Sequence, residues 1–363
     1  MDNLKKSLSE TLSHFDPLAG TITKENQSIL CDDYGVEFLE TRVDVKLSNV
    51  LKHHVDGCIL NRFVSTNLHY NNESGNSRDN LLQVVVQVNI FDCGGMVIGV
   101  SVLHKIADAA TASTFVSAWA RTNALRTNAE CKNVELITPS FDSASLFPPK
   151  EVPSFVLSSQ TNQEDNDIVF KRFVFDSSKI NPTKVETVSA LLWKCVSKVA
   201  GKAEPAEPSK PFYGHSLGNL LAPVMEGSMN NPSENELSEL VGNMRAEIRK
   251  LINGDYLKSK YKGNYELLSS MGDIHERFNK GDLTLYTITS WCRFPFYETD
   301  FGWGKPIWVC TVSVSNKNAC TLIDTRDGNG VEAWVTLDKY QMSELETDQE
   351  LREFASMGPI TMD

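Results

Sequence analysis

The sequence predicts an α/β (α+β) protein in which mixed sheets are flanked by helices. Along residues 82–90, apolar residues alternate with polar ones, which is the period of a β-strand. After Asp108, an Ala-rich segment places Phe115, Val116 and Trp119 on one face of a helix. Strand and helix patterns continue as far as residue 356, without a repeat of fixed period. Together these patterns predict layers of sheet and helix.

In the first part of the chain, Leu4, Leu8 and Leu12 have the spacing of a helix, and residues 47–51 predict a short second helix. Strands are predicted at residues 29–31 and 36–43, on either side of a turn at residues 32–35. A hairpin follows over residues 82–103, with its turn at residues 92–95. The alternation predicts that its first strand is half-buried.

Further along the chain, a strand is predicted at residues 168–175 and a helix at residues 183–199. Residues 203–211 are rich in Pro and Glu and are typical of a linker. A capping box at residues 233–236 opens another helix. Strands are then predicted at residues 283–291, 306–315, 320–324 and 331–337, and one closing helix at residues 338–356.

The chain has 363 residues, which exceeds one ordinary hydrophobic core and favours two domains. Residues 140–167 hold few periodic apolar positions and several prolines, which favours an inter-domain crossing. We therefore expect an N-terminal domain over residues 1–150, a crossover segment over residues 151–180 and a C-terminal domain over residues 181–363.

Charge and cysteine content restrict the partners and the compartment. The net charge of −12 argues against nucleic acid or an anionic membrane, since both need a basic surface. No apolar run is long enough to span a membrane, and residues 1–6 open an amphipathic helix rather than a signal peptide. The eight cysteines form no Cys-x-x-Cys pair, which favours a reducing, cytoplasmic location without disulfides.

His104 is placed where a core strand ends, and Asp108 lies at the N-terminus of the next helix. A titratable imidazole in that position suits proton transfer. A lone histidine is nevertheless more often a structural residue. If both residues lay on one helix, their spacing would favour a His–Asp dyad. With His104 at a strand end, Asp108 instead caps the helix or pairs with a distant arginine.

Residues 300–306 read Asp-Phe-Gly-Trp-Gly-Lys-Pro and form the second compact signal. The Asp-Phe-Gly string suggests a kinase, but the sequence has neither the Gly-rich loop nor the His-Arg-Asp loop that kinases need. A simpler interpretation is a tight turn in which Gly302 and Gly304 adopt conformations that other residues resist, with Trp303 filling a core. The remaining histidines lack the spacing of a zinc site, so we expect no metal.

Taken together, these segments resemble the plant BAHD acyl-CoA-dependent acyltransferases. The resemblance is carried by residues 104–108 and 300–306, and also by residues 91–95, 139–142, 290–293 and 330–334. It extends over nearly the whole chain and is nearest to the branch that acetylates alkaloid alcohols.

The resemblance implies two chloramphenicol-acetyltransferase-like domains with a channel between them, which acyl-CoA and an alcohol acceptor enter from opposite sides. His104 would be the general base, while the Thr289 hydroxyl and the Trp291 indole N–H would stabilise the oxyanion. Structural roles are implied for Asp108, Asp300, Gly302, Trp303 and Gly304. Hydroxyl groups and one cation suit CoA, for which the candidates are Thr183, Ser189, Ser216 and Arg293.

The sequence is thus interpreted as a monomeric acyl-CoA-dependent O-acyltransferase that transfers acetyl from acetyl-CoA to a hydroxyl of an alkaloid or similar metabolite, with no permanently bound cofactor. Compared with the family, it lacks a strand before the first helix, a segment near residues 180–182 and an Asn-Leu-Arg stretch before Ser216. Asp16 also stands where the family usually has tyrosine. Two alternatives remain open, namely a truncated non-catalytic paralogue and an enzyme that uses an aromatic acyl-CoA.

Overall fold

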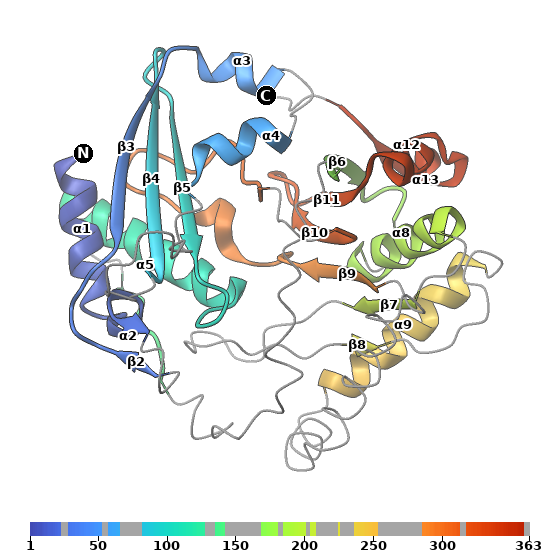
Figure 1. The fold of residues 1–363 in the computed structure, drawn as a ribbon, viewed down its shortest axis with the longest axis horizontal. Coiled ribbons are helices and arrows are strands. Elements are labelled where there is room, and N and C mark those ends of the chain that lie inside the picture. Colours follow the sequence, from blue (N-terminus) through green and yellow to red (C-terminus); the bar gives the residue numbers. More distant parts are fainter. Residues whose placement is uncertain are drawn as a thin grey trace, which may run out of the picture.

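In the computed structural model, the described residues are 1–22, 28–52, 57–65, 82–127, 135–141, 168–180, 184–200, 204–207, 224–225, 236–252, 285–312 and 317–358. Their strands gather in two main sheets that lie beside each other, as Figure 1 shows. One sheet is built from the N-terminal part of the chain and the other from the C-terminal part. The predicted mixture of strands and helices is therefore present.

The N-terminal sheet has the strand order β3 (Glu37–Val43), β4 (Val84–Phe91), β5 (Met96–Val102) among the described residues. Strands β3 and β4 are parallel, whereas β4 and β5 form the predicted antiparallel hairpin. Helices α1 (Asp2–Leu12) and α5 (Ala109–Thr127) pack against it through one shared apolar core. Short elements complete this part: α2 (Asp16–Ala19), α3 (Leu47–Lys52), α4 (Gly57–Leu60) and the 3₁₀ helix η1 (Asn61–Phe63).

Two sequence predictions for this part were wrong. Strand β2 (Ile29–Leu30) pairs with β1 (Thr21–Ile22), not with β3, so residues 32–35 do not close a hairpin between the two predicted strands. Strand β4 is buried on both faces rather than half-buried. Its polar residues are buried because they hold η1 to the sheet: Gln87 donates to the Arg62 carbonyl at 2.9 Å and Asn89 to the Phe63 carbonyl at 2.9 Å.

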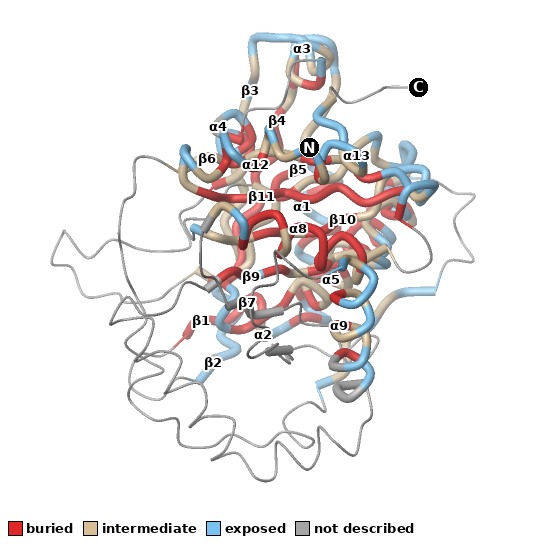
Figure 2. Tube along the Cα trace, turned by 90° about the vertical axis from the view of Figure 1, so that its right-hand side faces the viewer, coloured by how far each residue is buried: buried red, intermediate tan, exposed pale blue. Residues whose placement is uncertain are grey.

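The C-terminal sheet has seven strands in the part of the chain that is described. Their order is β12 (Ala355–Ser356), β6 (Ile168–Asp176), β11 (Gly330–Asp338), β10 (Ala319–Asp324), β9 (Leu285–Ser290), β7 (Glu204–Glu207) and β8 (Val224–Met225). Helices α8 (Lys184–Ala200) and α12 (Lys339–Thr347) pack against one face of this sheet, and α9 (Leu237–Ile252) packs against α8. In Figure 2 the central strands and α8 are mostly buried.

Three predictions for this part need correction. Residues 204–207 of the expected linker form β7, which pairs with β9 and β8 and so satisfies its backbone in the sheet. Residues 306–312 form no strand, and residues 313–315 lie outside the described chain. The expected closing helix is two helices, α12 and α13 (Gln349–Phe354), because Asp348 caps the second one by accepting the Leu351 N–H at 2.9 Å.

A third apolar cluster joins the two halves of the molecule. It contains Phe63 and Phe91 from the N-terminal half and Phe170, Ile323 and Trp334 from the C-terminal half. The Phe170 and Trp334 rings stack with their centroids 5.2 Å apart. Within the described residues, no helix has the length and apolarity needed to cross a membrane.

Candidate functional site

His104 lies in a turn directly after β5. Its side chain is exposed, whereas its neighbours Leu103, Ile106 and Ala107 are buried in the N-terminal core. The turn is closed by the Ile106 N–H, which donates to the Leu103 carbonyl at 3.0 Å. An exposed imidazole is thereby presented from a backbone that the core holds in place.

Asp108 caps the helix that follows. Its carboxylate accepts the Thr111 N–H at 2.8 Å, and its side chain is buried at the N-terminus of α5. Because α5 begins at Ala109, His104 and Asp108 are not on one helix, and the helical dyad is excluded. Of the two other interpretations of Asp108, the helix cap is confirmed.

Thr289 and Trp291 lie on the other half of the molecule. Along β9, Tyr286 and Ile288 point into the core beneath α8, so Thr289 points to the opposite face of the sheet. Trp291 follows the strand, donates its backbone N–H to the Leu322 carbonyl at 2.7 Å and packs its side chain against the cluster that joins the two halves. Both predicted oxyanion donors thus belong to the sheet face that is turned toward the N-terminal half.

Residues 300–304, which we call the motif loop, fold around one carboxylate. Asp300 accepts the backbone N–H groups of Gly302 at 2.7 Å and Gly304 at 2.9 Å. Both glycines have left-handed backbones, with φ of +100° and +109°. Phe301 is buried, and its ring packs almost perpendicular to the Trp119 ring, with the two centroids 4.9 Å apart. Trp303 does not fill a core as predicted: it is 52% exposed and stacks on Phe301.

The four CoA candidates have different surroundings. Ser189 is fully buried on α8, and its hydroxyl has no hydrogen-bond partner in the part of the chain that the structure describes. Arg293 is exposed, has a φ of +71° and donates its backbone N–H to Asp324 at 2.5 Å. Thr183 and Ser216 lie outside the described residues.

A buried ion pair near the joining cluster was not predicted from the sequence. Arg172 binds both carboxylate oxygens of Glu332, at 2.8 Å and 2.7 Å. Trp308 also donates to this carboxylate, at 3.3 Å. Burial, together with Glu332, raises the pKa of the Tyr297 phenol and raises the pKa of the Cys310 thiol to about 12. The only signal in the sequence is a charged residue inside an otherwise apolar strand.

The thiol beside the predicted oxyanion donors is not a nucleophile at neutral pH. Burial, and next the nearby Asp324 carboxylate, raise the pKa of Cys292 to about 12. Nor do His, Cys, Asp and Glu side chains of the described residues gather in any group of three that could hold a metal ion.

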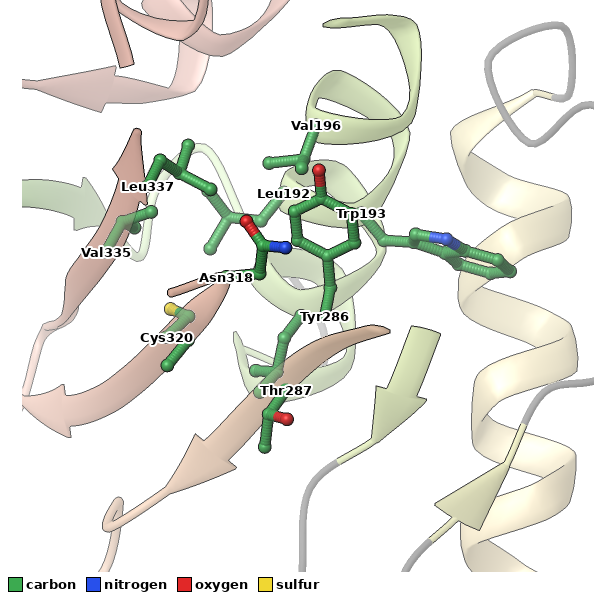
Figure 3. Close-up of a pocket in the computed structure, with 11 residues that line it drawn as sticks. Leu192, Trp193, Val196, Tyr286, Thr287, Asn318, Cys320, Val335 and Leu337 are labelled. Carbon is green, nitrogen blue, oxygen red and sulfur yellow. The ribbon is translucent and has the colours of Figure 1, made fainter. Parts of the chain in front are cut away.

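One cavity lies elsewhere, between α8 and the C-terminal sheet. In Figure 3, Leu192, Val196 and Tyr286 point toward it, while Trp193 turns away toward α9. It is about 20 Å³ in volume, which is room for roughly one water molecule. Most of its lining residues, among them Leu192, Val196 and Tyr286, belong to the core beneath α8, on the sheet face opposite Thr289. An acyl acceptor does not fit there.

A model of the Transferase family matches residues 1–352. The chain belongs to this family, the BAHD acyltransferases. Vinorine synthase of Rauvolfia serpentina is 33% identical over 94% of this chain and 82% of its own length. Stemmadenine O-acetyltransferase of Catharanthus roseus is 34% identical over 96% and 83%. Limonoid 21-O-acetyltransferase of Melia azedarach is 35% identical over 99% and 87%. The predicted resemblance to the BAHD family is confirmed.

Solved structures agree with this membership. The crystal structure of vinorine synthase matches this BAHD chain with a TM-score of 0.78 and 31% identity, over 99% of this chain and 86% of that one. The complex of F. sporotrichioides TRI101 with Coenzyme A and T-2 matches with a TM-score of 0.74 and 15% identity, over 98% and 91%. The second match bears on the fold alone. The predicted fold class is confirmed.

Proposed function

We propose that this BAHD acyltransferase transfers acetyl from acetyl-CoA to a hydroxyl group of a bulky, largely apolar alcohol such as an alkaloid or limonoid. The observation that carries the proposal is the exposed His104 imidazole on its anchored turn after β5. The relatives named for alkaloid and limonoid acetylation support the choice of acyl group and acceptor.

In the proposed reaction, neutral His104 takes the proton of the acceptor hydroxyl while the oxygen of that hydroxyl bonds to the thioester carbonyl carbon. The carbonyl π electrons move to oxygen and form an oxyanion, for which the Thr289 hydroxyl and the Trp291 indole N–H are the proposed donors. When the oxyanion collapses, the carbon–sulfur bond breaks and the imidazolium returns its proton to the CoA thiolate. The ester and free CoA are the products.

Asp108 and the motif loop take no part in this chemistry. The Asp108 carboxylate is engaged by the Thr111 N–H, and Asp300 by two loop amides. For CoA, we keep Arg293 as the candidate among the described residues that reaches solvent, together with Thr183 and Ser216. Ser189 can contribute only if its buried hydroxyl becomes accessible.

We also propose the finer assignments of a monomer in the cytoplasm, divided into domains at residues 1–150, 151–180 and 181–363. Six cysteines are free thiols, which suits a reducing compartment: Cys31, Cys93, Cys195, Cys292, Cys310 and Cys320. Strand β6, in the proposed crossover segment, pairs along its whole length with β11. That pairing ties the end of the crossover firmly to the C-terminal sheet.

The test is a competition assay with acetyl-CoA and coumaroyl-CoA, each offered with an alkaloid alcohol, a limonoid alcohol and shikimate. We expect ester formation from acetyl-CoA and the two apolar alcohols, because an apolar pocket rejects the shikimate carboxylate. Preferred transfer of coumaroyl would instead identify an aromatic acyl donor. Binding of CoA without transfer to any alcohol would favour the non-catalytic paralogue.

A further inference from the structure

Asn123 is a fully buried polar residue in the second half of α5. Its side-chain amide N–H donates to the backbone carbonyl of Phe301 at 2.6 Å. Its side-chain carbonyl accepts from the Ser7 hydroxyl at 3.0 Å. One carboxamide therefore contacts helix α1 and the motif loop at once, although these segments are far apart in the sequence.

The contacts close into a ring. The Trp119 indole N–H donates to the Ser7 oxygen at 3.1 Å, and the Trp119 ring packs edge-on against the Phe301 ring. Trp119 and Asn123 are four residues apart and so occupy one face of α5. Two side chains of α5 thereby hold Phe301, one by a hydrogen bond and one by an aromatic contact, and Ser7 of α1 contacts both of them.

The residue type indicates a specific role. Asparagine is unfavourable inside a helix, and a buried carboxamide is costly unless both its ends are paired. Here the side-chain carbonyl is paired with the Ser7 hydroxyl, and the partner of the side-chain N–H is the backbone of the motif loop. An apolar residue at this position would fill the space but would leave the Phe301 carbonyl without this donor.

We propose that Asn123 is a positioning residue that fixes the motif loop on α5, and through it the two halves of the active site. Helix α5 begins just after His104, while the motif loop follows Trp291 by a short connection through η3 (Pro295–Glu298). A helix is stiff, so a shift at the Asn123 end moves His104 relative to Thr289 and Trp291. The inference rests on the proposed function, since it assigns those residues to the reaction.

The test is the substitution Asn123→Leu, which keeps the approximate volume and removes both hydrogen bonds. Misplacing reacting groups by about 1 Å can cost about 10²-fold in rate, so we expect kcat to fall about 10- to 100-fold. The KM for acetyl-CoA should stay within about threefold of the wild-type value, because each substrate-binding surface is intact. Assays are run well below the melting temperature of the variant, where a purely stabilising residue would leave kcat unchanged.

The matched control is Ser117→Ala on the same helix. Ser117 is buried, and its hydroxyl has no hydrogen-bond partner among the described residues, so its loss should leave kcat unchanged. If Asn123→Leu does not fold, Ser7→Ala takes its place, because it removes the hydroxyl that orients the carboxamide. A wild-type kcat in the folded Asn123→Leu variant, or in Ser7→Ala when that variant is the one tested, overturns the proposal.

A second measurement separates this inference from the proposed function. Hydrogen exchange of residues 300–305 reports whether the loop is held, and it needs no turnover. We expect the Gly302 and Gly304 amides to exchange at least tenfold faster in Asn123→Leu than in the wild type or in Ser117→Ala. Unchanged exchange overturns the role of Asn123 even in an active enzyme. If exchange is faster in Asn123→Leu but the wild-type protein transfers no acetyl group, the proposed function is refuted and the role of Asn123 stands.

Discussion

A methyl group on Gly302 would lie 2.5 Å from the Thr127 Oγ1 atom and 3.1 Å from the Cα atom of Ala124. The motif loop thus approaches the last turns of α5 at the limit of backbone contact. Its left-handed backbone at Gly302 adds a second reason for glycine. The glycine at position 302 is therefore required for the contact between the motif loop and α5, the helix that follows His104.

The first prediction compares Gly302→Ala with Gly304→Ala. Both positions have left-handed backbones, but a methyl group on Gly304 would meet no described atom within 4 Å. Gly304→Ala should therefore lower the free energy of unfolding only by the backbone strain, about 1–3 kcal/mol. Gly302→Ala should lower it further, because the loop must also move off α5. Urea unfolding measures both values, and equal losses would argue against the close approach.

The second prediction concerns His104. His104→Ala should lower turnover by about 10²-fold or more, as expected for loss of a general base. Because the side chain is exposed, the melting temperature should change little. Lys105→Ala, at the adjacent exposed position, serves as the control and should retain turnover. A folded His104→Ala variant with wild-type turnover would remove His104 from the mechanism.

The third prediction concerns Asp108. Asp108→Ala removes the cap on Thr111 and should cost about 0.5–2 kcal/mol of stability. Turnover should fall together with stability, because the cap holds the start of the helix next to His104. Thermal unfolding and steady-state kinetics are measured on the same preparation. Native stability with abolished turnover would show that the carboxylate acts on the chemistry itself.

Local patterns in the sequence were sufficient for the elements that surround His104. The alternation over residues 82–90 and the spacing of Phe115 and Trp119 predicted β4 and α5, since period alone determines such elements. The pattern could not show that Gln87 and Asn89 are buried. Their burial depends on the carbonyl groups of η1, which come from a distant segment.

For the site itself, the sequence predicted individual residues but not which of them contact one another. The position of Asp108 before an Ala-rich helix predicted a cap or a pair with a distant arginine, and the structure shows the cap. By contrast, Trp303 was expected in a core, and Phe301 is the buried ring instead. Nothing local distinguishes the two aromatic residues, because Phe301 is selected by Trp119 and Asn123 on another element. Long-range packing of this kind has no signature in a single sequence.

The fourth prediction concerns the buried pair of Arg172 and Glu332, whose side chains are 12% and 3% exposed. Removing one charge leaves the other buried and unpaired, so Arg172→Met should cost about 3–5 kcal/mol. The double variant Arg172→Met/Glu332→Gln should be less damaged than Arg172→Met alone. As a control, Glu298→Gln breaks the exposed pair with Lys305 and should cost at most about 1 kcal/mol. Additive losses in the double variant would contradict the coupling.

The last prediction concerns the ion pairs that fasten α13 to α8. Lys198 lies 2.7 Å from Glu350 and 3.3 Å from Asp348, and Lys194 lies 2.7 Å from Glu350. Burial by itself would raise the pKa of the Glu350 carboxyl, but Lys194 and Lys198 hold it below its usual value of 4.5. For Asp348, burial likewise opposes the Leu351 N–H and Lys198, which lower its pKa.

Because these carboxyl pKa values are lower in the folded state, their contribution to stability is present above the unfolded pKa values. That contribution is lost as the pH falls through the folded-state pKa values of the two carboxyl groups. The melting temperature of the wild type should therefore drop between about pH 6 and pH 3 by more than that of Glu350→Gln. Glu344→Gln, at an exposed position on α12, should follow the wild-type curve. For Lys198, burial by itself would lower the pKa, but Glu350 and Asp348 raise it above its usual value of 10.5. The stability that Lys198 contributes is therefore fully present below the unfolded pKa of 10.5 and is lost as the pH rises through the folded pKa. Parallel curves for the wild type and Glu350→Gln in acid would show that these pairs add nothing to the stability of the fold.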